Sequence, residues 1–168
     1  MKPEVSIIMG SISDYEVVEK AAIFFNEMEV PFEMHALSAH RTPDEVKEFA
    51  TNAHKKGIKV IIAAAGMAAH LPGVIASLTH LPVIGLPIKS SFDGMDALLS
   101  IVQMPPGIPV ATVGVNASQN AAILALQIIS LADETHRKKL LMFKSNLKDK
   151  VIDANNKLSK KKFKFRIN

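Results

Sequence analysis

The chain of 168 residues is 48% hydrophobic and contains no cysteine, which predicts one domain with a sizeable core and excludes disulfides and cysteine metal sites. Its net charge of +4 arises from residues 157–168, which carry six Lys or Arg and no acid. The rest of the chain has 14 basic and 16 acidic residues, so we expect no nucleic-acid partner.

The N-terminus and the hydropathy pattern predict a cytoplasmic protein with no membrane partner. Residues 1–4 lead directly into a short apolar run, without the apolar segment of a signal peptide. No uninterrupted apolar run reaches the length that spans a bilayer. We expect residues 1–158 to form a single domain and residues 159–168 to form a solvated basic tail.

The first predicted unit is a strand over residues 4–10 followed by a helix over residues 17–28. The connection reads Ser-Ile-Ser-Asp, and Ser13 is expected to cap the helix, which leaves Ser11 and Asp14 free to face the carboxyl end of the strand. The glycine spacings of dinucleotide-binding and phosphate-binding loops are missing, so neither an NAD site nor an ATPase is supported.

The second unit is a strand over residues 32–37 and a helix over residues 43–56 that Gly57 ends. Thr42 is the expected N-cap, with a proline at the first helical position and a glutamate that closes a capping box. The string Ser38-Ala39-His40-Arg41 just before it lies where a strand end meets a helix N-terminus, a position that favours anions. A hydroxyl, an imidazole and a guanidinium there suggest a phosphorylated substrate.

The third strand is predicted over residues 58–63, and its continuous apolar character is typical of a parallel strand covered on both faces. The loop expected over residues 63–73 has almost no side-chain bulk before His70, so its backbone can approach a ligand closely. Further strands are predicted over residues 81–86 and 110–114. Between them we expect a polar loop over residues 88–94 and a buried helix over residues 95–104. Alternating strands and helices predict an α/β fold with a parallel sheet.

Two C-terminal helices predict oligomerisation. The helix expected over residues 117–132 is apolar nearly all round, and a small domain offers few places to bury it. The helix expected from Glu134 to about Leu158 carries a narrow apolar stripe and is too long for one domain of this size to cover.

Four strings, S-x-S-D, SAHRTP, AAHLPG and SIVQMP, occur in an order and spacing specific to one family. On these motifs, residues 4 to about 155 resemble the class I N5-carboxyaminoimidazole ribonucleotide mutases, the catalytic subunit of phosphoribosylaminoimidazole carboxylase in purine biosynthesis. The resemblance implies a three-layer flavodoxin-like fold with helices on both faces of the sheet. It also implies a homo-octamer whose active sites lie where neighbouring subunits meet.

The resemblance also implies the residues of the site. His40 would be the proton-transfer residue. The residues that bind the substrate would be Ser11, Asp14, Ser38, Arg41, Gly66, Ala68, His70 and Leu71. Among them Ser11, Ser38 and Arg41 would contact the phosphate and Asp14 the ribose, while His70 belongs to the loop that covers the imidazole. The chain departs from the family at Ala64 and Met67, where glycine is usual.

The implied reaction moves a carboxylate from the exocyclic nitrogen to ring carbon 4 of aminoimidazole ribonucleotide, with no metal or organic cofactor. An ATP-dependent synthetase that makes the N-carboxylated substrate would be the functional partner. Direct carboxylation of aminoimidazole ribonucleotide by carbon dioxide is the alternative reaction. A non-catalytic nucleotide-binding or flavin-binding module is the alternative from another class, because a fold alone does not define a function.

Overall fold

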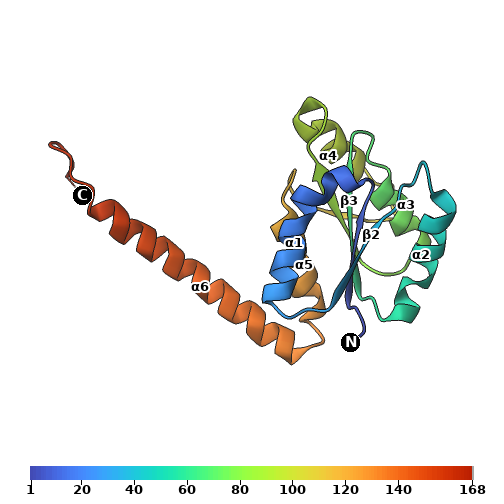
Figure 1. The fold of residues 1–168 in the computed structure, drawn as a ribbon, viewed down its shortest axis with the longest axis horizontal. Helices are drawn as coiled ribbons and strands as arrows, with labels where there is room; N and C mark the ends of the chain where they lie inside the picture. The colour runs from blue at the N-terminus through green and yellow to red at the C-terminus, as the bar shows by residue number, and fades with distance from the viewer. Residues whose placement is uncertain (168) are drawn as a thin grey trace.

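The computed structural model describes residues 1–167 and shows a parallel sheet covered by helices on both faces (Figure 1). Its strands are β1 (Val5–Met9), β2 (Phe32–Ala36), β3 (Val60–Gly66), β4 (Val83–Ile88) and β5 (Ala111–Thr112), in the order β2-β1-β3-β4-β5. The α-helices are α1 (Tyr15–Glu27), α2 (Pro43–Lys56), α3 (Leu71–Leu78), α4 (Met95–Val102), α5 (Ser118–Ile129) and α6 (Glu134–Ser159). Two 3-10 turns are η1 (Ile12–Asp14) and η2 (Phe92–Gly94). The expected flavodoxin-like α/β fold is confirmed.

The sheet separates two hydrophobic layers because alternate side chains of a strand point to opposite faces. Val5, Ile7 and Met9 of β1 pack into the layer that contains α1 and α5. Ile8 of the same strand packs into the layer with α2, α3 and α4. β1 and β4 are buried along their whole length, as expected for parallel strands with helices on both sides.

The region after β3 differs from the expectation of a loop over residues 63–73. β3 continues to Gly66, and α3 starts at Leu71. Pro72 is compatible with this helix because it lies in the first turn, where its missing N–H has no intrahelical partner to lose. The true connection is therefore the short segment 67–70, held between two rigid elements.

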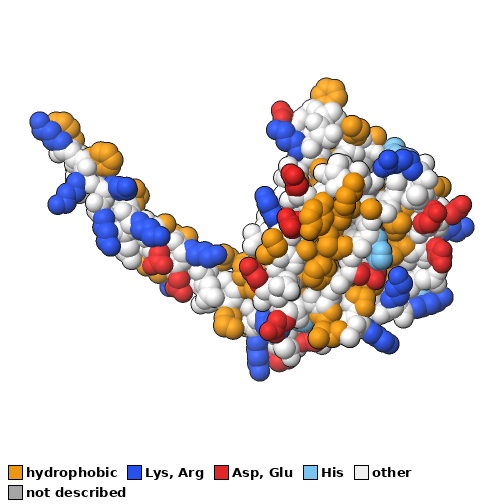
Figure 2. Space-filling model, in the orientation of Figure 1, with side chains coloured by type: hydrophobic (Ala, Val, Ile, Leu, Met, Phe, Trp, Pro, Cys, Tyr) orange, Lys and Arg blue, Asp and Glu red, His pale blue; other side chains and the backbone are white. Residues whose placement is uncertain are grey.

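α6 extends away from the sheet (Figure 1). Its first turns are anchored by His136 and Leu140, which are buried, and Nε2 of His136 lies 3.2 Å from Oε2 of Glu4. Nζ of Lys59 lies 2.8 Å from the same oxygen, so the helix begins at the amino end of the strands. Beyond this anchor, charged and hydrophobic side chains alternate along α6 in Figure 2.

α5 is largely buried within the single chain, because it packs beside α1 and against β3 and β4 of the sheet. The expectation that one domain offers few places to bury this helix is therefore wrong, and α5 gives no support to oligomerisation. In contrast to α5, α6 leaves much of its apolar surface exposed in the single chain. Leu147, Val151 and Leu158, members of the predicted apolar stripe, are 43%, 64% and 54% exposed. No helix in residues 1–167 combines the length and the hydrophobicity needed to cross a bilayer.

Candidate active site

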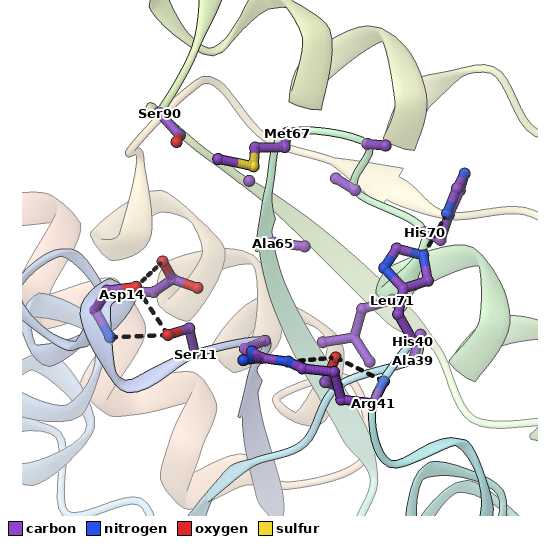
Figure 3. A pocket seen from close by; sticks show the side chains of 16 residues that line it. Ser11, Asp14, Ala39, His40, Arg41, Ala65, Met67, His70, Leu71 and Ser90 are labelled. Atoms are coloured by element: carbon purple, nitrogen blue, oxygen red, sulfur yellow. Dashed lines mark hydrogen bonds between the residues drawn. The ribbon is translucent and has the colours of Figure 1, made fainter.

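A cavity of about 500 Å³ opens at the carboxyl ends of β1, β2 and β3. The register pairs Met9 with Ala36 and with Ala64, so the loops that follow these strands start side by side. The cavity is lined by Gly10, Ser11, Ser13, Asp14, Ser38, Ala39, His40, Arg41, Ala65, Gly66, Met67, Ala68, Ala69, His70, Leu71 and Ser90. The structure thus brings together all nine residues expected at the site, as Figure 3 shows from close by.

The loop before α2 is closed by the side chain of Thr42. Its Oγ1 accepts a hydrogen bond from Ser38 N at 2.9 Å and donates one to Ser38 O at 3.1 Å. Thr42 occupies the N-cap position as predicted, but the predicted capping box is wrong, because this hydroxyl makes no bond to the helix. The hydroxyl stabilises the loop that carries Ser38, His40 and Arg41 instead.

Arg41 connects the first two loops of the site. Its Nη2 donates to Gly10 O at 3.0 Å, and its backbone N donates to Ser38 Oγ at 3.2 Å. The guanidinium is exposed to the cavity and retains further donors for a ligand. An arginine, a serine hydroxyl and a strand-end backbone at one place form a site suited to a phosphate group.

His40 and His70 form a direct pair, with Nε2 of His40 only 2.7 Å from Nδ1 of His70. Their rings are nearly perpendicular, at 83°, with centroids 4.9 Å apart. One of the two nitrogens donates and the other accepts, so the tautomer of each ring depends on the other. The sequence placed His70 in a covering loop, but it did not predict this contact, which joins α3 to the loop before α2.

The first loop differs from its prediction, because η1 lies between β1 and α1. Ser13 does not cap α1; instead Ser11 is the N-cap of η1, and its Oγ accepts from Ser13 N at 3.3 Å. Asp14 takes the N-cap position of α1 without a side-chain cap bond. Ser13 Oγ lies 2.9 Å from Ser11 Oγ and 3.4 Å from Asp14 Oδ1. The Asp14 carboxylate thus remains available to the cavity.

Burial raises the pKa of the Asp14 carboxyl above its ordinary value of 3.8, and bonds from the Ser13 side chain and the Ser11 backbone offset part of the rise. A raised pKa means that the folded state binds this proton more tightly, so folding stability falls as pH rises through the window that starts near 3.8. We therefore expect Asp14→Asn to melt at a higher temperature than the wild type at neutral pH. The difference should shrink as pH falls below 3.8, because the wild-type carboxyl is then neutral in both the folded and the unfolded state.

Thermal unfolding of the unliganded protein across this pH range tests the expectation. Ser13→Ala is the matched control: it removes a partner of the carboxylate, so it should lower stability at neutral pH. A variant Asp14→Asn that is less stable than the wild type at neutral pH would contradict the burial argument.

The third loop approaches the cavity with backbone and small side chains. A Cβ on Gly66 would lie 3.3 Å from Ile88 O, so the adjacent strand leaves little room for any other residue there. Met67 follows with a φ of 54°, a conformation in which glycine is the favoured residue. This backbone requirement gives a physical reason for the expected glycine at position 67. Ala64 lies in β3, where its methyl group is fully buried.

Ser90 also lines the cavity, although the sequence analysis did not include it in the site. It follows β4, the strand next to β3, and its loop reaches the same edge of the sheet. The sequence did predict a polar loop over residues 88–94, at the carboxyl end of the fourth strand. That position could have placed Ser90 at the site. Within residues 1–167 no group of three His, Cys, Asp or Glu side chains is placed to hold a metal ion.

A parallel sheet that presents two histidines, an arginine and several hydroxyls at its carboxyl edge defines an α/β enzyme for an anionic small molecule. The chain belongs to the AIR carboxylase family, whose model matches residues 4–150. The family membership expected from the motifs is confirmed.

Relatives cover almost the whole chain. The Pyrococcus abyssi protein named N5-carboxyaminoimidazole ribonucleotide mutase is 55% identical over 147 residues, 87% of this chain and 84% of that protein. The Thermotoga maritima protein of the same name is 48% identical over 167 residues, 99% of this chain and 98% of that protein. The crystal structure of Treponema denticola PurE matches with a TM-score of 0.84 and 31% identity, covering 93% of this chain and 98% of that one.

Proposed function

We propose that the protein is an N5-carboxyaminoimidazole ribonucleotide mutase, which moves the carboxylate of its substrate from the exocyclic nitrogen to carbon 4 of the ring. The observation that carries the proposal is the His40–His70 pair in one cavity with Arg41. Proton transfer and anion binding, the two tasks that this isomerisation needs, are thus available side by side. Incubating the purified protein with the N-carboxylated nucleotide and following the carbon-carboxylated isomer by chromatography tests the proposal.

The nucleotide would bind with its phosphate against Arg41, Ser38 and Ser11. In Figure 3 Ser11 and Arg41 lie along one side of the cavity, with Asp14 beside Ser11 and the two histidines farther along. Asp14 would accept hydrogen bonds from ribose hydroxyls, since a carboxylate next to the phosphate would repel it. The imidazole ring would then lie under the third loop, in contact with Gly66, Ala68 and Leu71 and within reach of the histidine pair.

The reaction needs one proton in each half, and His40 can handle both. As the C–N bond of the carbamate breaks, protonated His40 gives a proton to the exocyclic nitrogen and carbon dioxide is released into the cavity. Carbon 4 then attacks carbon dioxide, and neutral His40 takes the proton that this carbon must lose. His40 ends in the state in which it began. The 2.7 Å contact with His70 holds the ring in place and sets which nitrogen carries the proton.

Assembly into a homo-octamer belongs to the same proposal. In the single chain His40, Arg41 and His70 are exposed, so the cavity is open on one side and a neighbouring subunit could cover it. The helix expected to be buried over residues 95–104 is only half buried: α4 exposes an apolar row formed by Met95, Leu99 and Val102. This row offers one surface for a neighbour, and the stripe on α6 offers another. We propose residues 1–158 as the catalytic and assembly unit and residues 159–168 as a basic tail.

We also propose that the enzyme works in the cytoplasm with an ATP-dependent synthetase that supplies its substrate. An N-carboxylated amine loses carbon dioxide readily in water. The enzyme that makes it and the enzyme that uses it must therefore share a compartment.

Replacing Leu147, Val151 and Leu158 together with serine is expected to break the assembly without unfolding the subunit. These side chains are exposed in the single chain, whereas the anchor of α6 lies at Leu140 and remains intact. Without the apolar stripe, association of subunits through α6 no longer buries apolar surface and loses that favourable free energy. Light scattering measures the mass of the particle. Deletion of residues 160–168 is the control. It should leave the number of subunits in the particle unchanged, since this segment lies beyond the stripe and carries five Lys or Arg that oppose close packing. An intact oligomer in the triple variant would contradict the role given to α6.

A further inference from the structure

The side chain of Met67 is a large apolar group in a part of the cavity that is otherwise lined by small residues. Its neighbours along the loop, Ala65, Gly66, Ala68 and Ala69, carry a methyl group or none. Met67 is 60% exposed although it lines the cavity. In Figure 3 its thioether extends across the space above Ala65 toward Ser90, between Asp14 on one side and the histidines on the other.

The backbone at this position is in a conformation that a methionine adopts at a cost. Its φ of 54° lies in the left-handed region, which disfavours residues with a Cβ. The loop is held in this shape by hydrogen bonds from Ala69 N to Met67 O at 2.9 Å and from His70 N to Ala68 O at 2.8 Å. A non-glycine residue in such a conformation beside a candidate active site points to a role for its side chain in this chain.

We propose that Met67 covers the reacting ring and retains carbon dioxide in the cavity between its release from nitrogen and its capture by carbon. The inference rests on the proposed function. Carbon dioxide has no net dipole and no hydrogen to donate, so polar groups hold it weakly and an apolar wall must prevent its escape. A methionine side chain suits this task because it is flexible and can fold onto the bound ring. Met67 is therefore a positioning residue, and it takes no part in the proton transfer.

Isotope partition during the isomerisation tests the role. The N-carboxylated nucleotide is converted in the presence of labelled bicarbonate, and the label in the first product is measured for the wild type, Met67→Gly, Met67→Ala and Met67→Leu. We expect the glycine and alanine variants to take up more label by roughly threefold or above, the factor that corresponds to the loss of about one methylene group of apolar cover over the bound ring. Met67→Leu retains the bulk and should remain near the wild type.

The two small variants separate the side chain from the backbone. Met67→Gly removes the cover and also the unfavourable φ, whereas Met67→Ala removes only the cover. Equal label uptake in both assigns the effect to the lost side chain. Three results would overturn the inference. The first is wild-type label uptake in both small variants, the second is equal uptake in Met67→Leu and Met67→Gly, and the third is an increase confined to Met67→Gly. These outcomes are distinct from failure of the proposed function, in which the wild type itself forms no isomer and the inference falls with it.

Discussion

Replacing His40 with asparagine is expected to lower kcat for the isomerisation by about 10²–10⁴-fold, the usual range for general acid-base catalysis. Asparagine has a similar size and hydrogen-bonds at the same place, but it cannot take and return a proton near neutral pH. Nucleotide binding should survive, because the contacts proposed for the phosphate are made by Arg41, Ser38 and Ser11. Steady-state kinetics with the N-carboxylated nucleotide, together with calorimetric titration of the variant, measures both quantities.

Arg41→Ala is the matched comparison, because it removes a charged neighbour of His40 from the same loop. Its expected effect is a raised KM, since the phosphate loses a charge-assisted contact, with a lower kcat only if that contact also orients the ring. A His40→Asn variant that retains more than about a tenth of the wild-type kcat would rule out His40 as the essential proton carrier.

The second large effect concerns the source of carbon dioxide. If it is released and recaptured in the cavity, the N-carboxylated nucleotide should convert efficiently without added bicarbonate. Aminoimidazole ribonucleotide should need high bicarbonate, because free carbon dioxide must then enter from solution and loses the advantage of proximity. The wild type should place little label from bicarbonate in early product.

Initial rates with each nucleotide over a series of bicarbonate concentrations make the comparison quantitative. Efficient conversion of aminoimidazole ribonucleotide at low bicarbonate, or extensive early label, would favour direct carboxylation instead. The His40→Asn variant gives the background rate at which the N-carboxylated nucleotide disappears, because its spontaneous loss of carbon dioxide continues without proton transfer by the enzyme.

The placement of the site could be predicted from the sequence because it follows from topology. Three successive strand-helix units must deliver their loops to one edge of a parallel sheet, whatever the detailed contacts. The limits of α2 were also predicted, since Pro43 is favoured at the first position of a helix and Gly57 adopts the left-handed conformation, with φ of 102°, that ends it. Local chemistry was sufficient for both features.

Features that depend on contacts between distant residues were missed. The pairing of His40 with His70 requires the folded positions of two loops 30 residues apart. The hydroxyl of Thr42 had two possible partners, the helix start and the backbone of Ser38, and only the folded loop decides between them. The start of α3 was missed because proline and glycine near it are typical of a loop, although the first turn of a helix accepts both.

The anchor of α6 lies at the end of the sheet opposite the cavity. Glu4, Lys59 and His136 meet before β1 and β3 begin, while Gly10 and Gly66 mark the ends of these strands at the cavity. A helix of 26 residues, about 39 Å long, then carries the C-terminus farther from the body (Figure 1). A tether, a label or a second protein joined there would lie far from the mouth of the same subunit's cavity. The C-terminus is thus an attachment point for immobilising the single subunit while its own cavity remains accessible to nucleotides.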